Sequence, residues 1–176
     1  NVFCVKYDSD TTWPEGFDYE ESGAIGPNAD LSSIECYDVL RGICLSDMDL
    51  SGADLSNKHL QNADFSDSDL IKCNLSGSDL DGADFSNSDL FGADLSSTDL
   101  WAVDLCGINL SETNLSNTLL EDIDMSNVDL SNANLYRTRL SRVDLSGANL
   151  SGVNLYRGSF NVVYLYPRAI NSEKSL

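Results

Sequence analysis

Carboxylates and hydroxyls make up most of the chemically capable side chains in this chain, and they recur with a period of five residues. Against 29 Asp and Glu residues there is a single histidine, His59, at a position where the neighbouring units have Asp or Asn. The chain has no Gly-rich phosphate loop, no Cys-x-x-Cys pair and no His-Glu-x-x-His motif. Serine is abundant, but a serine nucleophile needs an adjacent base, and the repeats supply none. The sequence therefore predicts a protein that is not an enzyme.

Columns of carboxylates could hold Ca²⁺ weakly, because calcium prefers oxygen ligands. The chain has neither an EF-hand loop nor a Gly-Gly-x-Gly-x-Asp repeat that would build a dedicated calcium site. We therefore expect no metal site and no cofactor.

The five cysteines are too few and too scattered to form a disulfide framework. Cys73 replaces a small residue that we expect to point inward, where a buried thiol behaves as a small apolar group. Cys106 stands in a position that is serine in other units, and we expect it to point outward. Cys4, Cys36 and Cys44 could in principle pair near the N-terminal end. The sequence cannot supply the geometry that a disulfide requires, so reduced thiols are our default expectation.

These groups are spaced by an apolar register that runs from Leu40 to Ile170. Every fifth residue is apolar over this range, which gives twenty-seven positions in one register. A period of five spreads side chains around an α-helix, and it puts alternate ones on opposite faces of a flat strand. The register makes a buried core only if the chain turns a corner every five residues. Four such segments would close a square coil, and the coils would stack as a solenoid.

The units, for example Ala53-Asp54-Leu55-Ser56-Asn57, resemble those of the pentapeptide repeat family. The resemblance implies an all-β protein that folds as a right-handed quadrilateral β-helix. It implies that Leu55 and Ala53 point inward, while Asp54, Ser56 and Asn57 point outward or shape the corner. The inward slot two residues before each centre is usually small. Coils with a larger residue in this slot are expected to bulge, and these residues are Ile43, Met48, Lys58, Ile108 and Ile123.

Residues 1–28 do not follow the repeat, and we expect them to form a short helical or irregular N-terminal cap. Asp18 and Glu21 have the spacing of a capping box. An open β-helix end exposes apolar side chains and unpaired backbone groups, which favours a cap over a recognition arm built on Trp13 and Phe17. The β-helix is expected over residues 29–170, and a C-terminal tail over residues 171–176.

The stretch Trp13-Pro14-Glu15-Gly16-Phe17-Asp18 is similar to segments that flank repeat blocks in cyanobacterial pentapeptide proteins, which indicates a cyanobacterial source. Family members there occur in the cytoplasm, the periplasm and the thylakoid lumen, and the sequence leaves all three compartments open. No run of eighteen apolar residues is present, so no membrane span is expected.

Charge is distributed unevenly along the chain, whose net charge is −19. Residues 40–135 contain eighteen Asp and Glu against three Lys and Arg, whereas residues 136–176 contain two acids and six bases. An acidic rod repels nucleic acid and acidic membranes over most of its length, so we expect neither as a direct partner. One outward column is acidic throughout, and its members are Asp64, Asp84, Asp104, Asp124 and Asp144. These carboxylates either satisfy corner backbone groups or form an anionic surface, and both roles are compatible.

The basic end concentrates residue types that are favoured at protein interfaces. Stacking by twenty residues places Tyr136 on Tyr156 and Arg137 on Arg157, with Arg139 and Arg142 beside them. The final coil is expected to expose Phe160, Val163 and Leu165 beside unpaired strand edges, which invites pairing with another chain. We therefore expect a protein partner at this end, or a homodimer formed through it.

Two functions fit these features. The first is a non-catalytic structural or protein-interaction solenoid, and the second is a DNA mimic that inhibits or modulates DNA gyrase. The family resemblance suggests mimicry, because the family includes quinolone-resistance proteins that resemble duplex DNA and occupy gyrase. A rod of about 32 Å corresponds to roughly nineteen charges of duplex DNA. The regular coils carry nineteen acids but also eight bases, so mimicry ranks second.

Overall fold

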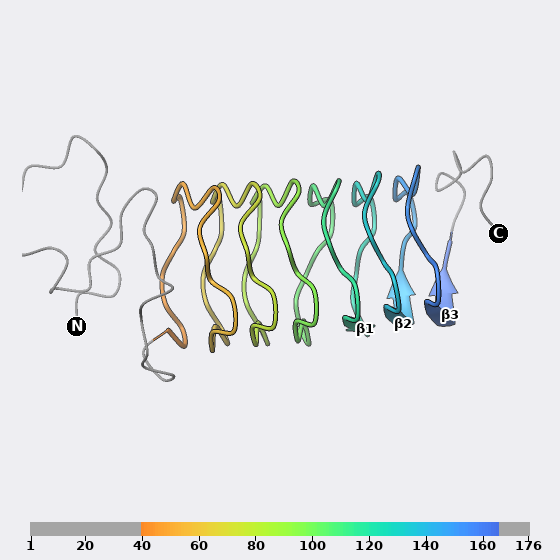
Figure 1. The fold of residues 1–176 in the computed structure, drawn as a ribbon, viewed down its shortest axis with the longest axis horizontal. Coiled ribbons are helices and arrows are strands. Elements are labelled where there is room, and N and C mark those ends of the chain that lie inside the picture. The colour runs from red at the N-terminus through yellow and green to blue at the C-terminus, as the bar shows by residue number, and fades with distance from the viewer. Residues whose placement is uncertain (1–39, 166–176) are drawn as a thin grey trace, which may run out of the picture.

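Each five-residue unit forms one side of a square coil, because a turn follows every apolar centre. The computed structural model describes residues 40–165, and in Figure 1 the coils lie side by side along the long axis of the molecule. Parallel backbone bridges join residues twenty apart, from Cys44 and Asp64 in the first coils to Asn134 and Asn154 in the last. The protein is a right-handed quadrilateral β-helix, as the resemblance to pentapeptide repeats implies.

Three continuous strands run along the last coils, and the two longer ones also pass the corners at Arg142 and Val162. They are β1 (Leu119–Glu121), β2 (Arg139–Asp144) and β3 (Ser159–Tyr164), in a parallel sheet with the order β1-β2-β3. Leu119 pairs with Arg139, and Arg139 pairs with Ser159, so each step advances by one coil. We call the outward side of this sheet the sheet face.

The corners depend on a left-handed backbone at the second residue after each centre. Positive φ recurs at this position from Gly42 to Val162, with eight glycines and seventeen other residues. Asn and Asp supply nine of the seventeen, since their short polar side chains tolerate this conformation best after glycine. The requirement explains why Gly, Asn and Asp recur immediately after the outward serine.

The apolar centres form a dry column inside the coils. Nearly all of them are fully buried, and the Phe65 and Phe85 rings stack with centroids 5.0 Å apart and an interplanar angle of 3°. Burial of one such side chain contributes about 1.5–3 kcal/mol relative to exposure. The predicted inward register is therefore confirmed.

The turns differ in width at the inward slot. Where this residue is Ala, its N–H donates to the preceding centre at 2.9–3.0 Å, as at Ala63 and Ala83. At Val103, Val128, Val153 and Ile108 the same hydrogen bond lengthens to 3.4 Å. The expected bulge is thus seen as a wider turn at Ile108, whereas Ile43 is buried with a bond of 3.1 Å and makes a normal turn.

Val103 marks a local interruption of the backbone ladder. Among residues 40–165, the bridges of this column join Asp64 to Asp84 and Asp124 to Asp144, but none joins Asp104 to either neighbour. The inward slot in this column changes from Ala83 to the larger Val103. The bridge between Asp124 and Asp144 is present beside Ile123 and Val143, so the size of the slot residue alone does not account for the interruption.

Serine and threonine in the slot satisfy their hydroxyls inside the stack. Ser68 donates to the carbonyl of Leu45 in the preceding coil at 2.6 Å, and Thr98 donates to Leu95 in its own turn at 2.7 Å. No buried side-chain oxygen or nitrogen of residues 40–165 lacks a hydrogen-bond partner. Hydrogen bonds therefore offset the desolvation cost of the polar side chains in the core.

Several predictions concern residues outside the described range. The cap over residues 1–28, the start of the repeats at residue 29, the tail over residues 171–176 and the cysteines Cys4 and Cys36 all lie there. Within residues 40–165 no helix is long and apolar enough to span a bilayer.

The inward and outward assignment predicts opposite outcomes at adjacent positions. Leu95 is buried and Ser96 is partly exposed. Leu95→Lys should unfold the stack, because it places an unpaired charge in the apolar column, while Ser96→Lys should change the melting temperature by only a few degrees. Thermal unfolding followed by circular dichroism checks this. Equal losses at both positions would contradict the assignment.

Candidate interaction surfaces

The Asp or Asn before each centre holds the corner that follows it. Asp54 accepts a hydrogen bond from the backbone N–H of Ser56 at 3.0 Å, and this contact recurs around the coils. The predicted acidic column, here called the acidic ladder, follows the same rule. Its members Asp64, Asp84, Asp104, Asp124 and Asp144 each accept from the N–H two residues on, at 2.8–3.0 Å. The predicted role in satisfying corner backbone groups is confirmed.

The corner contact also affects the charge of one ladder carboxylate. The hydroxyl and the backbone N–H of Ser146 both donate to Asp144, and they hold the pKa of this carboxyl below its ordinary value. Hydrogen bonds to a carboxylate favour its charged form. The contact with Ser146 therefore favours the negative charge of Asp144.

The column on the opposite side of the coil relieves the same repulsion with asparagine. Asn74 donates from Nδ2 to Asp54 at 3.1 Å, and Asn114 donates in the same way to Asp94. The acidic ladder contains no asparagine from Asp64 to Asp144. It is therefore a strip of like charge that no amide donor from its own column neutralises.

Tyrosine and arginine replace serine and asparagine at one corner of the last coils. Tyr136 and Tyr156 stack with ring centroids 6.0 Å apart and an interplanar angle of 22°. The Arg137 guanidinium lies 5.2 Å from the centroid of Tyr136, and Arg157 lies 5.5 Å from that of Tyr156. The predicted stack of Tyr136 on Tyr156 is confirmed. Both arginine contacts are within cation–π range.

Both arginines occupy the left-handed corner position. Their φ angles are 58° for Arg137 and 61° for Arg157. Earlier coils place Asn57, Gly77 and Asn117 at this position of the same column. A left-handed residue with a Cβ costs roughly 1–2 kcal/mol. Strain of this kind persists where another requirement selects the side chain, and it is a basis for a hypothesis of function.

The structure divides the predicted basic cluster in two. Arg142 lies at the next corner and forms ion pairs with Glu121 at 2.6 Å and Asp122 at 2.5 Å. The Arg142 guanidinium lowers the pKa of Asp122 by hydrogen bonding, and the two acids raise the pKa of Arg142. Its charge is therefore compensated within the rod. Sequence reasoning missed this pair, although Asp122 stands one coil before Arg142.

The charges of the other three arginines of the predicted cluster are not compensated by ion pairs within residues 40–165. Arg139 is exposed on β2, and within residues 40–165 no carboxylate forms an ion pair with Arg137, Arg139 or Arg157. We call this group, with its two tyrosines, the basic corner: Tyr136, Arg137, Arg139, Tyr156 and Arg157. It is a compact cationic and aromatic surface on an otherwise acidic rod.

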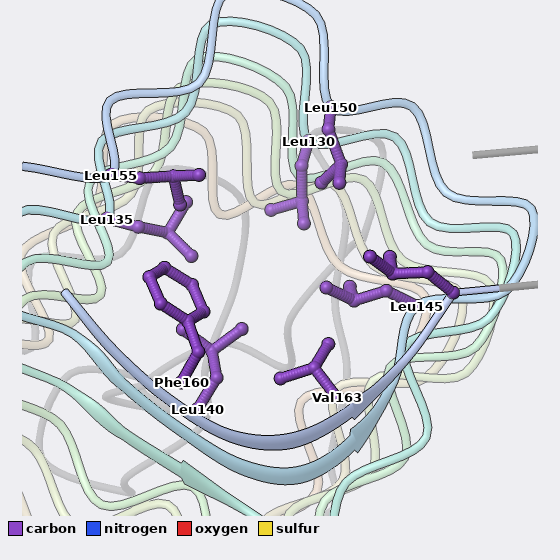
Figure 2. Close-up of a pocket in the computed structure, with 9 residues that line it drawn as sticks. Leu130, Leu135, Leu140, Leu145, Leu150, Leu155, Phe160 and Val163 are labelled. Atoms are coloured by element: carbon purple, nitrogen blue, oxygen red, sulfur yellow. The ribbon is translucent and has the colours of Figure 1, made fainter. Parts of the chain in front are cut away.

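The last described coil ends in an apolar hollow. Phe160 is 52% exposed and Leu165 is 58% exposed, while Val163 is partly buried. A cavity of about 250 Å³ opens here, and Figure 2 shows the Phe160 ring and Val163 projecting into it from β3. Its other lining residues are Leu130, Leu135, Leu140, Leu145, Leu150, Leu155 and Leu165. The predicted exposure of Phe160 and Leu165 is confirmed.

Exposed apolar residues also occur on the sheet face and beside it. Trp101 is 62% exposed at the corner that borders this face, and Leu119 on β1 is 44% exposed. Sequence reasoning did not connect either residue with the basic corner. The coil geometry connects Leu119 with it, because Leu119 pairs directly with Arg139.

Residues 40–165 contain no group of three or more His, Cys, Asp or Glu side chains that could hold a metal ion. The arrangement therefore offers surfaces for contact: an acidic ladder, a basic corner and an apolar end.

These features define a β-helical repeat protein built from five-residue units. A family model described as pentapeptide repeats (8 copies) matches residues 49–87, 88–127 and 123–161. The matches cover more than half of the chain, and the chain belongs to the pentapeptide repeat family.

Solved structures of similar proteins include Rfr23, a pentapeptide repeat protein from the cyanobacterium Cyanothece 51142. It is 31% identical, with a TM-score of 0.39, and the match covers 55% of this chain and 63% of that one. A pentapeptide repeat protein from the Arabidopsis thaliana thylakoid lumen is 25% identical, with a TM-score of 0.29, over 69% of this chain and 74% of that one. QnrB1, a plasmid-mediated fluoroquinolone resistance protein, is 16% identical, with a TM-score of 0.42, over 71% of this chain and 87% of that one. No curated protein matches this chain significantly.

Cysteine reactivity tests the geometry of the coils. Burial, together with the nearby Asp54 carboxylate, raises the pKa of the Cys73 thiol to about 12, whereas Cys106 is exposed. At pH 8 iodoacetamide should alkylate Cys106 in the folded protein and Cys73 only after denaturation, because the thiolate is the reactive form. Peptide mapping by mass spectrometry resolves the two sites. Equal labelling of both in the folded protein would place Cys73 outside the core.

Proposed function

We propose that this protein is a non-catalytic interaction solenoid whose C-terminal end contacts another protein. The observation that carries the proposal is the basic corner, where three arginines without ion-pair partners among residues 40–165 lie beside stacked tyrosines. Tyr and Arg are enriched at the energetically important centres of interfaces. The stack also holds the side chains in place before binding, which reduces the entropy lost on association.

The strained backbone supports this reading. Asn at the position of Arg157 would fit the left-handed corner better, as Asn57 and Asn117 do in the same column. The chain nevertheless places Arg at this position in two successive coils. We infer that the guanidinium groups serve an external contact, because the stack of apolar centres does not need them.

The partner is a protein, since the acidic rod disfavours nucleic acid and anionic membrane. A second copy of the chain is an alternative partner. End-to-end contact of two copies would bury Phe160 and Leu165, but a symmetric interface would also bring the two basic corners toward each other.

The test restores the ordinary corner residues. The double variant Tyr156→Ser, Arg157→Asn recreates the Ser-Asn pair of earlier coils, and it should fold with equal or higher stability because corner strain is relieved. It should lose capture of the natural partner from a native lysate by tenfold or more. The matched control Ser96→Ala, Ser97→Asn changes the same column two coils or more away and should retain capture.

Sedimentation velocity of the wild type and the double variant separates the two kinds of partner. A wild-type dimer that the variant loses would identify a second copy. A monomeric wild type excludes the homodimer, and unchanged capture by the variant would contradict the proposed contact altogether.

A second candidate function is DNA mimicry directed at gyrase, and the acidic ladder favours it. Asp84, Asp104 and Asp124 are exposed, ionisable and aligned along the rod axis. The basic corner and the lower charge density make this candidate weaker than the first.

Asparagine substitution tests the mimic without disturbing the corners, because Asn keeps an Oδ1 acceptor. The triple variant Asp84→Asn, Asp104→Asn, Asp124→Asn is compared with the matched variant Asp49→Asn, Asp69→Asn, Asp89→Asn on another column. We expect the wild type to leave gyrase supercoiling unaffected at tens of times the enzyme concentration. Inhibition that only the ladder variant relieves would establish mimicry and overturn the ranking.

A further inference from the structure

Strand β3 has an open edge. It pairs with β2 alone in the described sheet. One coil earlier, the carbonyl of Thr138 accepts from the N–H of Ser159 at 3.0 Å, and the N–H of Leu145 donates to the carbonyl of Tyr164 at 2.9 Å. The equivalent groups of the last coil are the Gly158 carbonyl and the Leu165 N–H, and neither has a partner within residues 40–165. Backbone groups spaced as in a parallel ladder are thus available for one more strand.

The cavity lies next to this edge. Phe160 and Val163 of β3 line it together with leucines of the last two coils (Figure 2). Its nine lining residues are all apolar, so a water molecule inside would find no side-chain hydrogen-bond partner. A volume of about 250 Å³ accommodates one large apolar side chain. An added strand that follows the course of β3 would point two side chains, three residues apart, into the cavity, as Phe160 and Val163 do on either side of the corner at Val162.

The opposite face of such a strand would meet positive charge. Arg139 of β2 stands on the sheet face and Arg157 stands at the corner that leads into β3, while the one acid of β2, Asp144, lies at the far end of that strand. Strand β3 itself, Ser159–Tyr164, contains no acid. The outward side chains of an added strand are therefore complementary to this surface when they are carboxylates.

We propose that the open edge of β3 binds an extended acidic segment of another protein as an additional strand, with one bulky apolar side chain in the cavity. The binding mode is strand addition, in which main-chain hydrogen bonds give affinity and side-chain pockets give specificity. The inference rests on the proposed function and specifies the chemistry of the partner. A second copy fits less well, because a symmetric end-to-end contact sets Arg137, Arg139 and Arg157 against their own counterparts.

Synthetic peptides test the proposal directly. The probe is the blocked hexapeptide Glu-Phe-Glu-Gly-Val-Glu, whose apolar residues have the spacing of Phe160 and Val163 and whose glycine permits the left-handed corner found at Val162. Its controls replace Phe by Ala, replace every Glu by Lys, or substitute a ten-residue oligothymidylate for the peptide. We expect the wild type to bind the Glu-Phe peptide in titration calorimetry, the Ala peptide about tenfold more weakly, and the other two not at all.

Protein variants localise the site. Arg157→Asn should weaken binding about three- to tenfold, while the matched control Lys72→Asn removes one charge from the same kind of corner far from β3 and should leave binding unchanged. Val163→Phe fills the cavity and should abolish binding of the Glu-Phe peptide. Hydrogen exchange of the Leu165 amide should slow when the peptide is bound, because that N–H gains an acceptor.

Each contrary result overturns the inference. Absence of binding by the Glu-Phe peptide, binding that Val163→Phe does not affect, or preferred binding of the oligothymidylate would exclude an acidic strand in the cavity. Self-association that protects the Leu165 amide without peptide would assign the edge to a second copy. The proposed function fails separately, when the Tyr156→Ser, Arg157→Asn variant still captures the natural partner.

Discussion

The left-handed backbone at every corner is the constraint on which the rest of this structure depends. A turn after each apolar centre makes an odd repeat compatible with a buried column, and each turn requires positive φ at its second residue. Glycine, asparagine and aspartate satisfy this requirement at the lowest cost. The preceding Asp or Asn then caps the turn through its Oδ1 atom, as Asp54 does for Ser56. Composition, charge and hydrogen bonding of the rod therefore have one origin.

This origin changes how the acidity should be interpreted. A carboxylate that caps a corner is present for a structural reason, so a net charge of −19 is not by itself evidence of a charged ligand or target. Departures from the corner rule carry more information. Arg137 and Arg157 add bulk and strain where asparagine would suffice, and Phe160 and Val163 border a hollow that the described coils leave open. The functional hypotheses rest on these departures.

The sequence predicted most of the fold because residues twenty positions apart contact each other throughout the repeats. Adding twenty residues predicts the stacks of Phe65 on Phe85 and Tyr136 on Tyr156. It did not predict the ion pairs of Arg142, because a long side chain at a corner can reach several neighbours and only coordinates show which.

The predicted positions of the bulges were partly wrong, since Ile43 makes a normal turn while the interruption lies at Val103 and Asp104. Local widening depends on the packing of neighbouring coils rather than on one side chain. The cavity also escaped prediction, because its shape depends on rotamers at the end of the stack.

The twenty-residue register has a further consequence for how such a molecule can change over time. Every coil contacts only the coil before it and the coil after it, and equivalent atoms meet at each step. Duplication or deletion of one coil would therefore preserve every type of contact and alter the length by about 4.8 Å. The separation between the two ends can evolve in fixed increments while the chemistry of each end stays the same.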